Sequence, residues 1–153
     1  MRRVYGLGTV SPQALHENFN FRVEIDGLAS TSFTEVVVPD AWIDVTEYRE
    51  GAETSSSARP VPGRVHYGTV VLRRGISDNL DLYRWFDEIR RGHLDRRNVA
   101  IVLEDASRQP IRRWLVHDAW PARYAGPTLD GQGSDVVIEE IELAHDGIEI
   151  EVE

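Results

Sequence analysis

The sequence predicts a mainly β protein: an antiparallel β-barrel or sandwich of about eight strands with one packed α-helix. Three observations support this prediction. Apolar and polar residues alternate with period two in several segments, among them 19–26 and 148–153. Turn sequences such as Asp26-Gly27 separate these segments. Helical spacing of apolar residues occurs in one segment, 77–92, which indicates a single helix.

The expected strands follow one another along the chain. The first, from Phe19 to Asp26, alternates apolar and polar residues, which is typical of a strand with one buried face. The second ends at Pro39-Asp40, and Gly126-Pro127 marks a later loop. After the first strand, the pattern predicts strands at about 32–38, 42–48, 65–73, 98–104, 111–118, 135–143 and 148–152.

The helix is expected to begin at Ser77, whose hydroxyl suits an N-cap, with Asp78 and Asp81 in the first turn. Gly92 follows two arginines and is a typical residue at a helix end. Between these ends lies an apolar stripe at helical spacing, formed by Leu82, Trp85, Phe86 and Ile89.

With 153 residues, the chain is expected to form one domain over 1–153. Residues 1–17 show no clean period and are interpreted as an N-terminal extension. Residues 50–63 are rich in serine, proline and glycine and predict a long polar loop between two strands. Such loops inside compact chains are often functional.

Composition narrows the functional classes. The chain has no cysteine, which excludes disulfides, thiolate metal sites and cysteine nucleophiles. No apolar run reaches the roughly 18 residues of a membrane span, and no secretory signal is evident, so cytoplasmic synthesis without membrane insertion is expected. The net charge of −9 argues against a free nucleic-acid binder. Arginines concentrate before residue 113 and acids after it, which suits contact between copies of the chain.

Chemical motifs are absent from the sequence. It shows no nucleophile elbow, phosphate loop or zinc-protease motif. The five histidines are dispersed and never stand at metal-ligand spacing. We therefore expect no catalytic, metal or cofactor site and no enzymatic activity.

The ordered string of segments is more specific than any one of them. It comprises NFNFRVEIDGL and SFTEV, then EYREG, then an expected Pro-Gly-Arg turn at Pro62 to Arg64, then TVVLRRGISDNLDLYRWFDEI, then Arg113 to Pro127, and finally Val137 to Ile148. Together, over residues 18–149, these segments resemble the phage tail tube protein family. The connection VVVPDAWIDV departs from the family pattern, which more often has a glycine-containing turn there.

The resemblance implies a structural subunit of the inner tube of a contractile phage tail or an extracellular contractile injection particle. In that family, subunits form six-fold rings related to type VI secretion tubes, and the rings stack into a hollow conduit. The implied partners are other copies of the chain, the tail sheath protein and the baseplate or spike proteins. Cargo protein or DNA would pass through the lumen without sequence-specific binding. The particle would assemble in the bacterial cytoplasm and be released on lysis.

The polar loop has no core to fill, so we expect it to contact a neighbouring ring. The residues assigned to this ring–ring contact are Tyr48, Arg49, Glu50, Gly51, Pro62, Gly63 and Arg64.

Two other functions remain open at this stage. The first is a tube-initiator or baseplate adaptor ring of the same family. The second, from another class, is a small-ligand-binding β-barrel, which would need a concave pocket with convergent polar groups.

Overall fold

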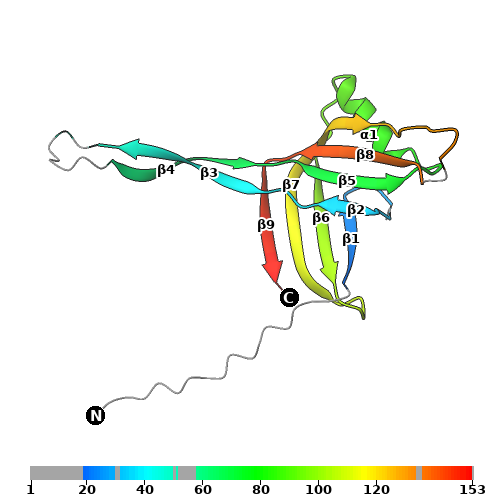
Figure 1. Ribbon diagram of the computed structural model, residues 1–153, viewed down its shortest axis with the longest axis horizontal. Coiled ribbons are helices and arrows are strands. Elements are labelled where there is room, and N and C mark those ends of the chain that lie inside the picture. Colours follow the sequence, from blue (N-terminus) through cyan, green and yellow to red (C-terminus); the bar gives the residue numbers. More distant parts are fainter. Residues whose placement is uncertain (1–18, 30–31, 50, 52–57, 134–135, 153) are drawn as a thin grey trace, which may run out of the picture.

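The computed structural model describes residues 19–29, 32–49, 51, 58–133 and 136–152 of the chain. Within them, nine strands and one helix are present (Figure 1). In chain order these are β1 (Asn20–Ile25), β2 (Glu35–Val37), β3 (Ala41–Tyr48), β4 (Arg59–Tyr67), β5 (Val70–Gly75), α1 (Asp81–Arg90), β6 (Arg97–Glu104), β7 (Pro110–Ala125), β8 (Ile138–Ala144) and β9 (Gly147–Val152).

Seven strands form one antiparallel sheet that bends into two halves. Half-sheet A has the order β1-β6-β7-β9, and half-sheet B has the order β2-β5-β8-β7. The long strand β7 belongs to both, because it pairs with β9 over residues 112–117 and with β8 over residues 120–125. Figure 1 shows the strands of the two halves running nearly at right angles. Among the described residues the sheet does not close into a barrel. Of the two expected arrangements, barrel or sandwich, a closed barrel within one copy is therefore corrected.

The bend in β7 lies at Asp118, whose φ of 51° is in the left-handed region. Its backbone N–H donates to Oδ1 of Asn98, at a point where the pairing of β6 with β7 also shifts register. Strands that pass from one sheet to another at a corner commonly do so through such local irregularities. Beyond the corner, β7 continues through Pro121. The proline is tolerated because pairing with β6 ends at Ala119, and among the described residues no other strand pairs with that side of β7 there.

The core fills the inside of this corner and is covered by α1. Trp85 of the helix is 2% exposed, and its indole N–H donates to the carbonyl of Asp95 at 2.7 Å. The expected apolar stripe therefore does face the core. The other buried members come from both half-sheets and the helix: Val23, Ile25, Val70, Leu72, Leu82, Val99, Ile101, Val116, Ala119, Ile141 and Leu143.

The helix begins later than the sequence pattern predicts. Its first residue is Asp81, and Ser77 does not cap it. Instead, the Ser77 hydroxyl accepts a bond from the N–H of Asn79, and Asn79 Oδ1 accepts one from the N–H of Asp81. The expected end is confirmed, because α1 stops at Arg90 and Gly92 has a φ of 88°.

A buried ionic group ties this helix start to half-sheet B. Arg74 is 2% exposed and donates from Nε to Glu139 at 2.5 Å and from Nη2 to the carbonyl of Asn79 at 2.8 Å. The second carboxylate oxygen of Glu139 accepts a bond from the Tyr124 hydroxyl at 2.7 Å. Burial, together with this hydrogen bond, raises the pKa of Tyr124 from 10.0 to about 12. The folded protein therefore favours the neutral phenol.

A raised phenol pKa makes stability depend on pH in the alkaline range. The contribution of neutral Tyr124 is complete below pH 10 and is lost as the pH rises toward about 12. We expect the melting temperature measured by circular dichroism to fall over this window. Tyr124→Phe should start lower, because the bond to Glu139 is gone, and should fall less steeply. Tyr48→Phe, in an exposed strand, is the matched control and should follow the wild type; equal slopes in all three proteins would contradict this role.

Candidate assembly interface

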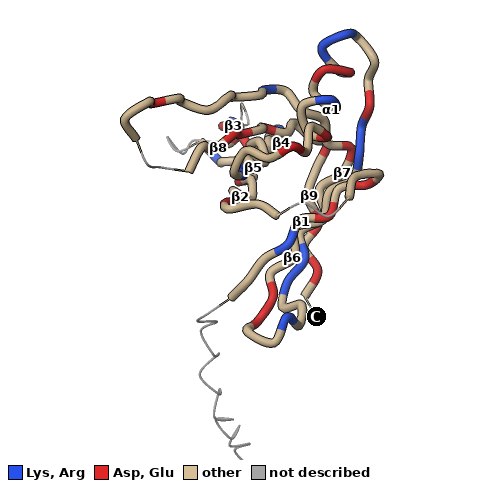
Figure 2. The backbone as a smooth tube through the Cα atoms, turned by 90° about the vertical axis from the view of Figure 1, so that its right-hand side faces the viewer, with Lys and Arg blue, Asp and Glu red and all other residues tan. Residues whose placement is uncertain are grey.

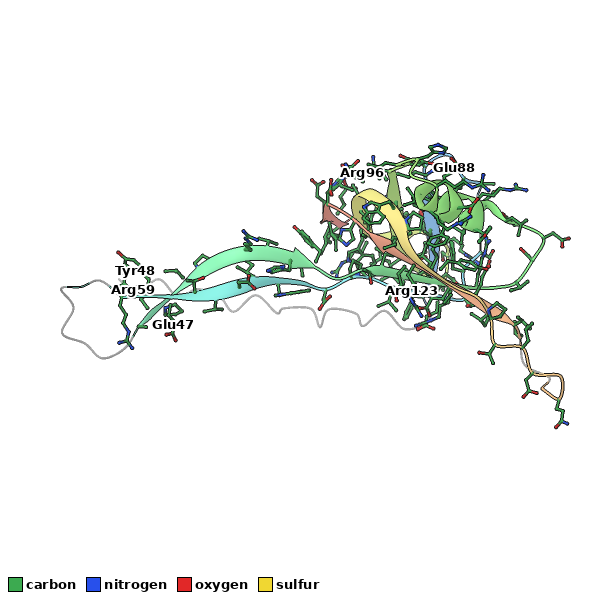
Figure 3. All side chains as sticks on the ribbon, turned by 90° about the horizontal axis from the view of Figure 1, so that it is seen from above. Glu47, Tyr48, Arg59, Glu88, Arg96 and Arg123 are labelled. Atoms are coloured by element: carbon green, nitrogen blue, oxygen red, sulfur yellow. The ribbon has the colours of Figure 1, made fainter. Side chains whose placement is uncertain are left out.

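The strands β3 and β4 form a two-stranded arm that extends away from the rest of the protein (Figures 1 and 3). The arm continues the β2–β5 ribbon in the same register: Val37 pairs with Val71, and Ala41 pairs with Tyr67. Every residue of β3 is exposed. Isolated two-stranded ribbons are at best marginally stable in water, so an exposed arm of this kind favours a partner.

The root of the arm is fixed to the body. The N–H of Gly68 donates to the carbonyl of Asp40 at 2.9 Å, and Nε2 of His145 lies 2.8 Å from the carbonyl oxygen of Gly68. A Cβ at Gly68 would lie 2.1 Å from Oδ1 of Asp40, so a larger residue there would require the Asp40 side chain to move. The arm is therefore attached to half-sheet B by backbone bonds rather than by a loose linker.

The structure places the residues assigned to ring–ring contact on this arm, in two groups. Tyr48 ends β3, where it pairs with Arg59, and Arg49 and Gly51 follow it. Figure 3 shows Tyr48 and Arg59 at the far end of the arm. Glu50 lies outside the described residues. The second group, Pro62 to Arg64, lies within β4, closer to the body.

The expected loop at 50–63 is shorter than the sequence indicates, because β4 begins at Arg59. Prolines are tolerated here since both strands of a two-stranded ribbon are edge strands. Pro62-Gly63-Arg64, expected as a turn, is instead a bulge: the pairs Ile43–Val65 and Val45–Pro62 leave one extra residue in β4. A Cβ at Gly63 would lie 3.1 Å from both Asp44 Cβ and Thr46 Oγ1, which explains a glycine there.

The two faces of the arm differ in character. One face carries the cross-strand pairs Ala41–Tyr67 and Ile43–Val65, and Ile43 and Val65 are 52% and 54% exposed. On the other face, the Trp42 and His66 rings stack with centroids 5.3 Å apart. Nε2 of His66 also lies 2.7 Å from Asp44 Oδ2. Sequence reasoning missed this apolar face, although the alternation of Ile43 and Val45 with polar residues was its signal.

Half-sheet A ends in strands that each have an unpaired edge within the described residues. Strand β1 pairs only with β6, and β9 pairs only with β7. Large apolar side chains are exposed beside both edges: Phe19 is 58%, Ile150 60% and Val152 72% exposed. Exposed strand edges template pairing with another chain, and monomeric proteins usually protect them. These edges were missed as specific residues because edges depend on the strand order.

The two faces of half-sheet A are sharply different. Directly paired residues share a face, so Arg22, Val102, Arg113 and Glu151 form one row, and Glu24, Ala100, Leu115 and Glu149 form the next. Figure 2 shows both basic and acidic residues in the region of β1 and β6. Arg22 contacts Glu24 at 2.9 Å, and Nη1 of Arg113 lies 3.7 Å from Glu24. This polar face lies opposite the core face that holds Val23, Ile101 and Val116.

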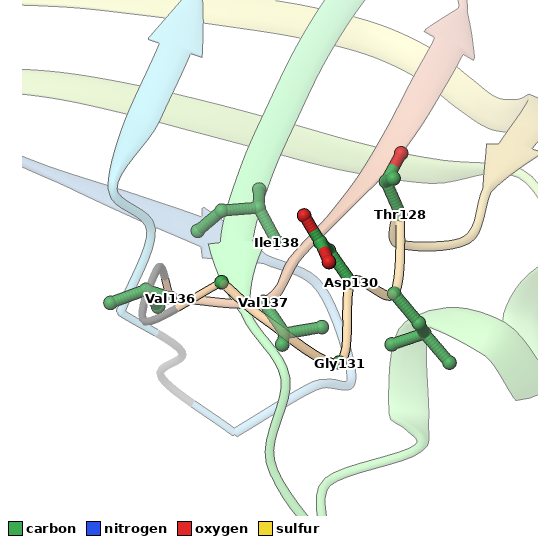
Figure 4. A pocket seen from close by; sticks show the side chains of 8 residues that line it. Thr128, Asp130, Gly131, Val136, Val137 and Ile138 are labelled. Atoms are coloured by element: carbon green, nitrogen blue, oxygen red, sulfur yellow. The ribbon is translucent and has the colours of Figure 1, made fainter.

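A pocket of about 600 Å³ lies where the connection from β7 to β8 folds over the end of half-sheet B (Figure 4). Of the residues that line it, only Asp130 is ionisable, and its carboxylate accepts a bond from the N–H of Gln132. The described residues contain no cluster of three potential metal ligands. None of the described helices is long and apolar enough to cross a membrane. The features of the described residues that point to a partner are the arm and the sheet edges.

Comparison with known proteins agrees with this geometry. Residues 17–149 match the family model described as T4-like virus tail tube protein gp19. No curated protein sequence matches the chain.

The solved structures that share the fold include the following three. A chain of the anti-feeding prophage tube terminating cap has 20% identity and a TM-score of 0.84, covering 98% of this chain and 99% of that one. A chain of the PVC sheath-tube complex, an extracellular contractile injection system in its extended state, has 22% identity and a TM-score of 0.81, covering 92% and 94%. A chain of the anti-feeding prophage baseplate has 24% identity and a TM-score of 0.76, covering 93% and 97%.

The fold is thus that of proteins found in contractile injection systems. This chain belongs to the T4 gp19-like tail tube protein family, a family of structural tube proteins and not of enzymes. The resemblance inferred from the ordered segments is confirmed.

The bulge glycine offers a test of the arm. Gly63→Ala would force a Cβ against Asp44 and Thr46, so the ladder between β3 and β4 should open near the bulge. Amide hydrogen exchange should rise at least about tenfold in residues 43–46 and 61–65, a change that corresponds to about 1.4 kcal/mol of local opening energy. Gly51→Ala, where a Cβ meets nothing within 4 Å, is the matched control. Unchanged exchange in the Gly63 variant would show that the bulge does not need a glycine.

Proposed function

We propose that this protein is a subunit of the inner tube of a contractile tail or injection particle, in which six copies form a ring and rings stack into a hollow conduit. The open edges of β1 and β9 carry the proposal. They lie on opposite sides of half-sheet A, so each copy presents two different edges, one to each neighbour. Association through two different surfaces is head-to-tail, and it produces a closed ring when the rotation between copies closes.

Strand direction supports this arrangement. The four strands of half-sheet A alternate in direction, because each neighbouring pair is antiparallel. Strands β1 and β9 therefore run in opposite directions. When β9 of one copy meets β1 of the next, the new pair is antiparallel as well, and the alternation continues around the ring. Closure removes the free edges that would otherwise attract other chains.

The two faces of half-sheet A fit an inner wall. The polar face, with Arg22, Glu24, Arg113, Glu149 and Glu151, would line a water-filled lumen, and the apolar face would pack outward against the core and the helix. Cargo protein or DNA would then meet a surface that carries both charge signs. Such a wall has no arrangement that reads a base sequence.

The arm supplies the contact between rings. Its exposed residues Tyr48, Arg49, Gly51 and Arg64, with Glu50 and the bulge residues Pro62 and Gly63, would dock on a neighbouring ring or subunit. Ordering of the arm by a neighbour explains how a strand pair with every β3 side chain exposed is maintained. In this account the whole chain, 1–153, is one tube domain with an N-terminal extension at 1–17.

The remaining partners follow from the same role. The tail sheath protein would surround the tube, and baseplate or spike proteins would hold its end; energy for movement would come from the sheath. The particle would assemble in the bacterial cytoplasm and leave on lysis.

A position at the tube end is a second candidate, because the fold also occurs in the baseplate structure. Copy number separates the two: a main tube subunit is present many times in each particle, and an adaptor ring only once.

Shortening the arm tests the division of roles. Deletion of residues 52–60 removes the arm's end but leaves β1 and β9 intact, so rings should still form and stacked tubes should be lost. Negative-stain electron microscopy of the purified wild type and the variant gives the result directly. Circular dichroism melting of both proteins controls for folding of the body. Normal tubes from the variant would refute the ring–ring role of the arm, and dispersed monomers from the wild type would refute the tube function.

A further inference from the structure

The proposed ring leaves open how β9 of one copy is aligned with β1 of the next, and the described residues narrow this alignment to one register. The inference rests on the proposed ring and concerns which side chains meet across its subunit boundary. A strand pair can slide in steps, and each step changes which residues are opposite one another. Three constraints are available: the two faces of the strands, the charges on the polar face and the exposed apolar side chains.

The faces remove half of the registers. On β1 the core face carries Phe21, Val23 and Ile25, and on β9 it carries Ile148, Ile150 and Val152. A shift by one residue would turn the apolar side of one strand toward the polar side of the other. Glu149 and Glu151 must therefore face the positions of Asn20, Arg22, Glu24 or Asp26.

Charge separates the registers that remain. Extending the rows of the sheet straight across the boundary would place Glu151 opposite Arg22 but Glu149 opposite Glu24. A step here is a shift of two residues, which keeps the faces aligned. Sliding β9 one step toward the C-terminal end of β1 would place Glu151 opposite Glu24 and Glu149 opposite Asp26. Like charges that face each other directly across strands are destabilising. One step in the other direction places Glu149 opposite Arg22 and Glu151 opposite Asn20, with no like-charged pair.

The exposed apolar residues select the same register. It sets Ile150 opposite Phe21 and Val152 opposite Phe19, so the three most exposed apolar side chains beside these edges become covered. In the straight extension Val152 lies opposite Phe21, so Phe19 lies beyond the end of β9 and no residue of β9 covers it. A further step in the favoured direction moves Val152 past Phe19 and leaves Arg22 opposite Gly147.

We propose that β9 of one copy pairs with β1 of the next in the register that sets Glu149 opposite Arg22, Ile150 opposite Phe21 and Val152 opposite Phe19. The Glu149–Arg22 pair fixes the alignment. Within one copy, Arg22 already contacts Glu24 and Glu104 on its own half-sheet. The guanidinium would therefore join a network that continues into the neighbouring subunit.

Disulfide trapping tests this register, and the absence of cysteine from the chain gives a clean background. Directly opposite residues have Cα atoms about 4.5–5.5 Å apart, within the range for a disulfide, whereas diagonal neighbours are about 7–8 Å apart and outside it. The variant N20C with E151C places cysteines opposite each other in the proposed register. F21C with V152C reports the straight extension, and V23C with V152C reports the register one step beyond; both pairs leave Arg22, Glu24 and Glu149 in place.

The result is read on a non-reducing gel after mild oxidation of assembled protein, beside electron micrographs of the same samples. We expect N20C/E151C to lose most of its monomer band to covalent multimers that reductant reverses, and the other two pairs and single E151C to remain largely monomeric. Cross-linking of F21C/V152C or V23C/V152C in its place would overturn the register and leave the ring intact. Rings without any cross-link would show that other edges join. Dispersed monomers in the micrographs of the wild type would overturn the ring itself.

Discussion

The unpaired backbone edges of β1 and β9 are the constraint on which the rest of the structure depends. A strand edge presents N–H and C=O groups that pair readily with another chain, and a protein that left such edges exposed would tend to aggregate. In half-sheet A both edges are flanked by exposed apolar side chains, Phe19 on one side and Ile150 and Val152 on the other. In the proposed ring the sheet is completed by copies of the same chain, and the alternation of its four strands would let the same contact be repeated without a break.

The corner at Asp118 separates two tasks within one sheet. Half-sheet A has the two unpaired edges to which we assign lateral association, while half-sheet B carries the arm and is bonded to the start of the helix through Arg74 and Glu139. Because β7 runs through both halves, the arm and the edges are held in one covalently continuous frame. The backbone bond between Gly68 and Asp40 and the contact of His145 with the Gly68 carbonyl join the arm to this frame.

Sequence patterns predicted the parts of this fold that local chemistry determines. The stripe around Trp85 and the alternation from Phe21 to Ile25 required only the periods of a helix and a strand. Local sequence patterns failed to predict the structure where pairing with a strand distant in the sequence determines it. Pro62-Gly63 has the sequence of a turn but forms a bulge, because β3 pairs with β4 both before and after it. Pro121 continues strand β7 because the pairing of β7 with β6 has already ended at Ala119. The open edges were beyond prediction from pattern alone, since strand order is set by contacts between residues far apart in the sequence.

Hydrogen exchange on assembled particles tests the central claim most directly. Backbone amides of β1 and β9 that bond to neither β6 nor β7 are open to solvent in a single copy, and pairing between copies would bury them in a ladder. These amides should exchange fast in diluted, single copies and should become strongly protected in the assembled protein. Exchange that stays as fast after assembly as before it would show that the copies associate through some other surface.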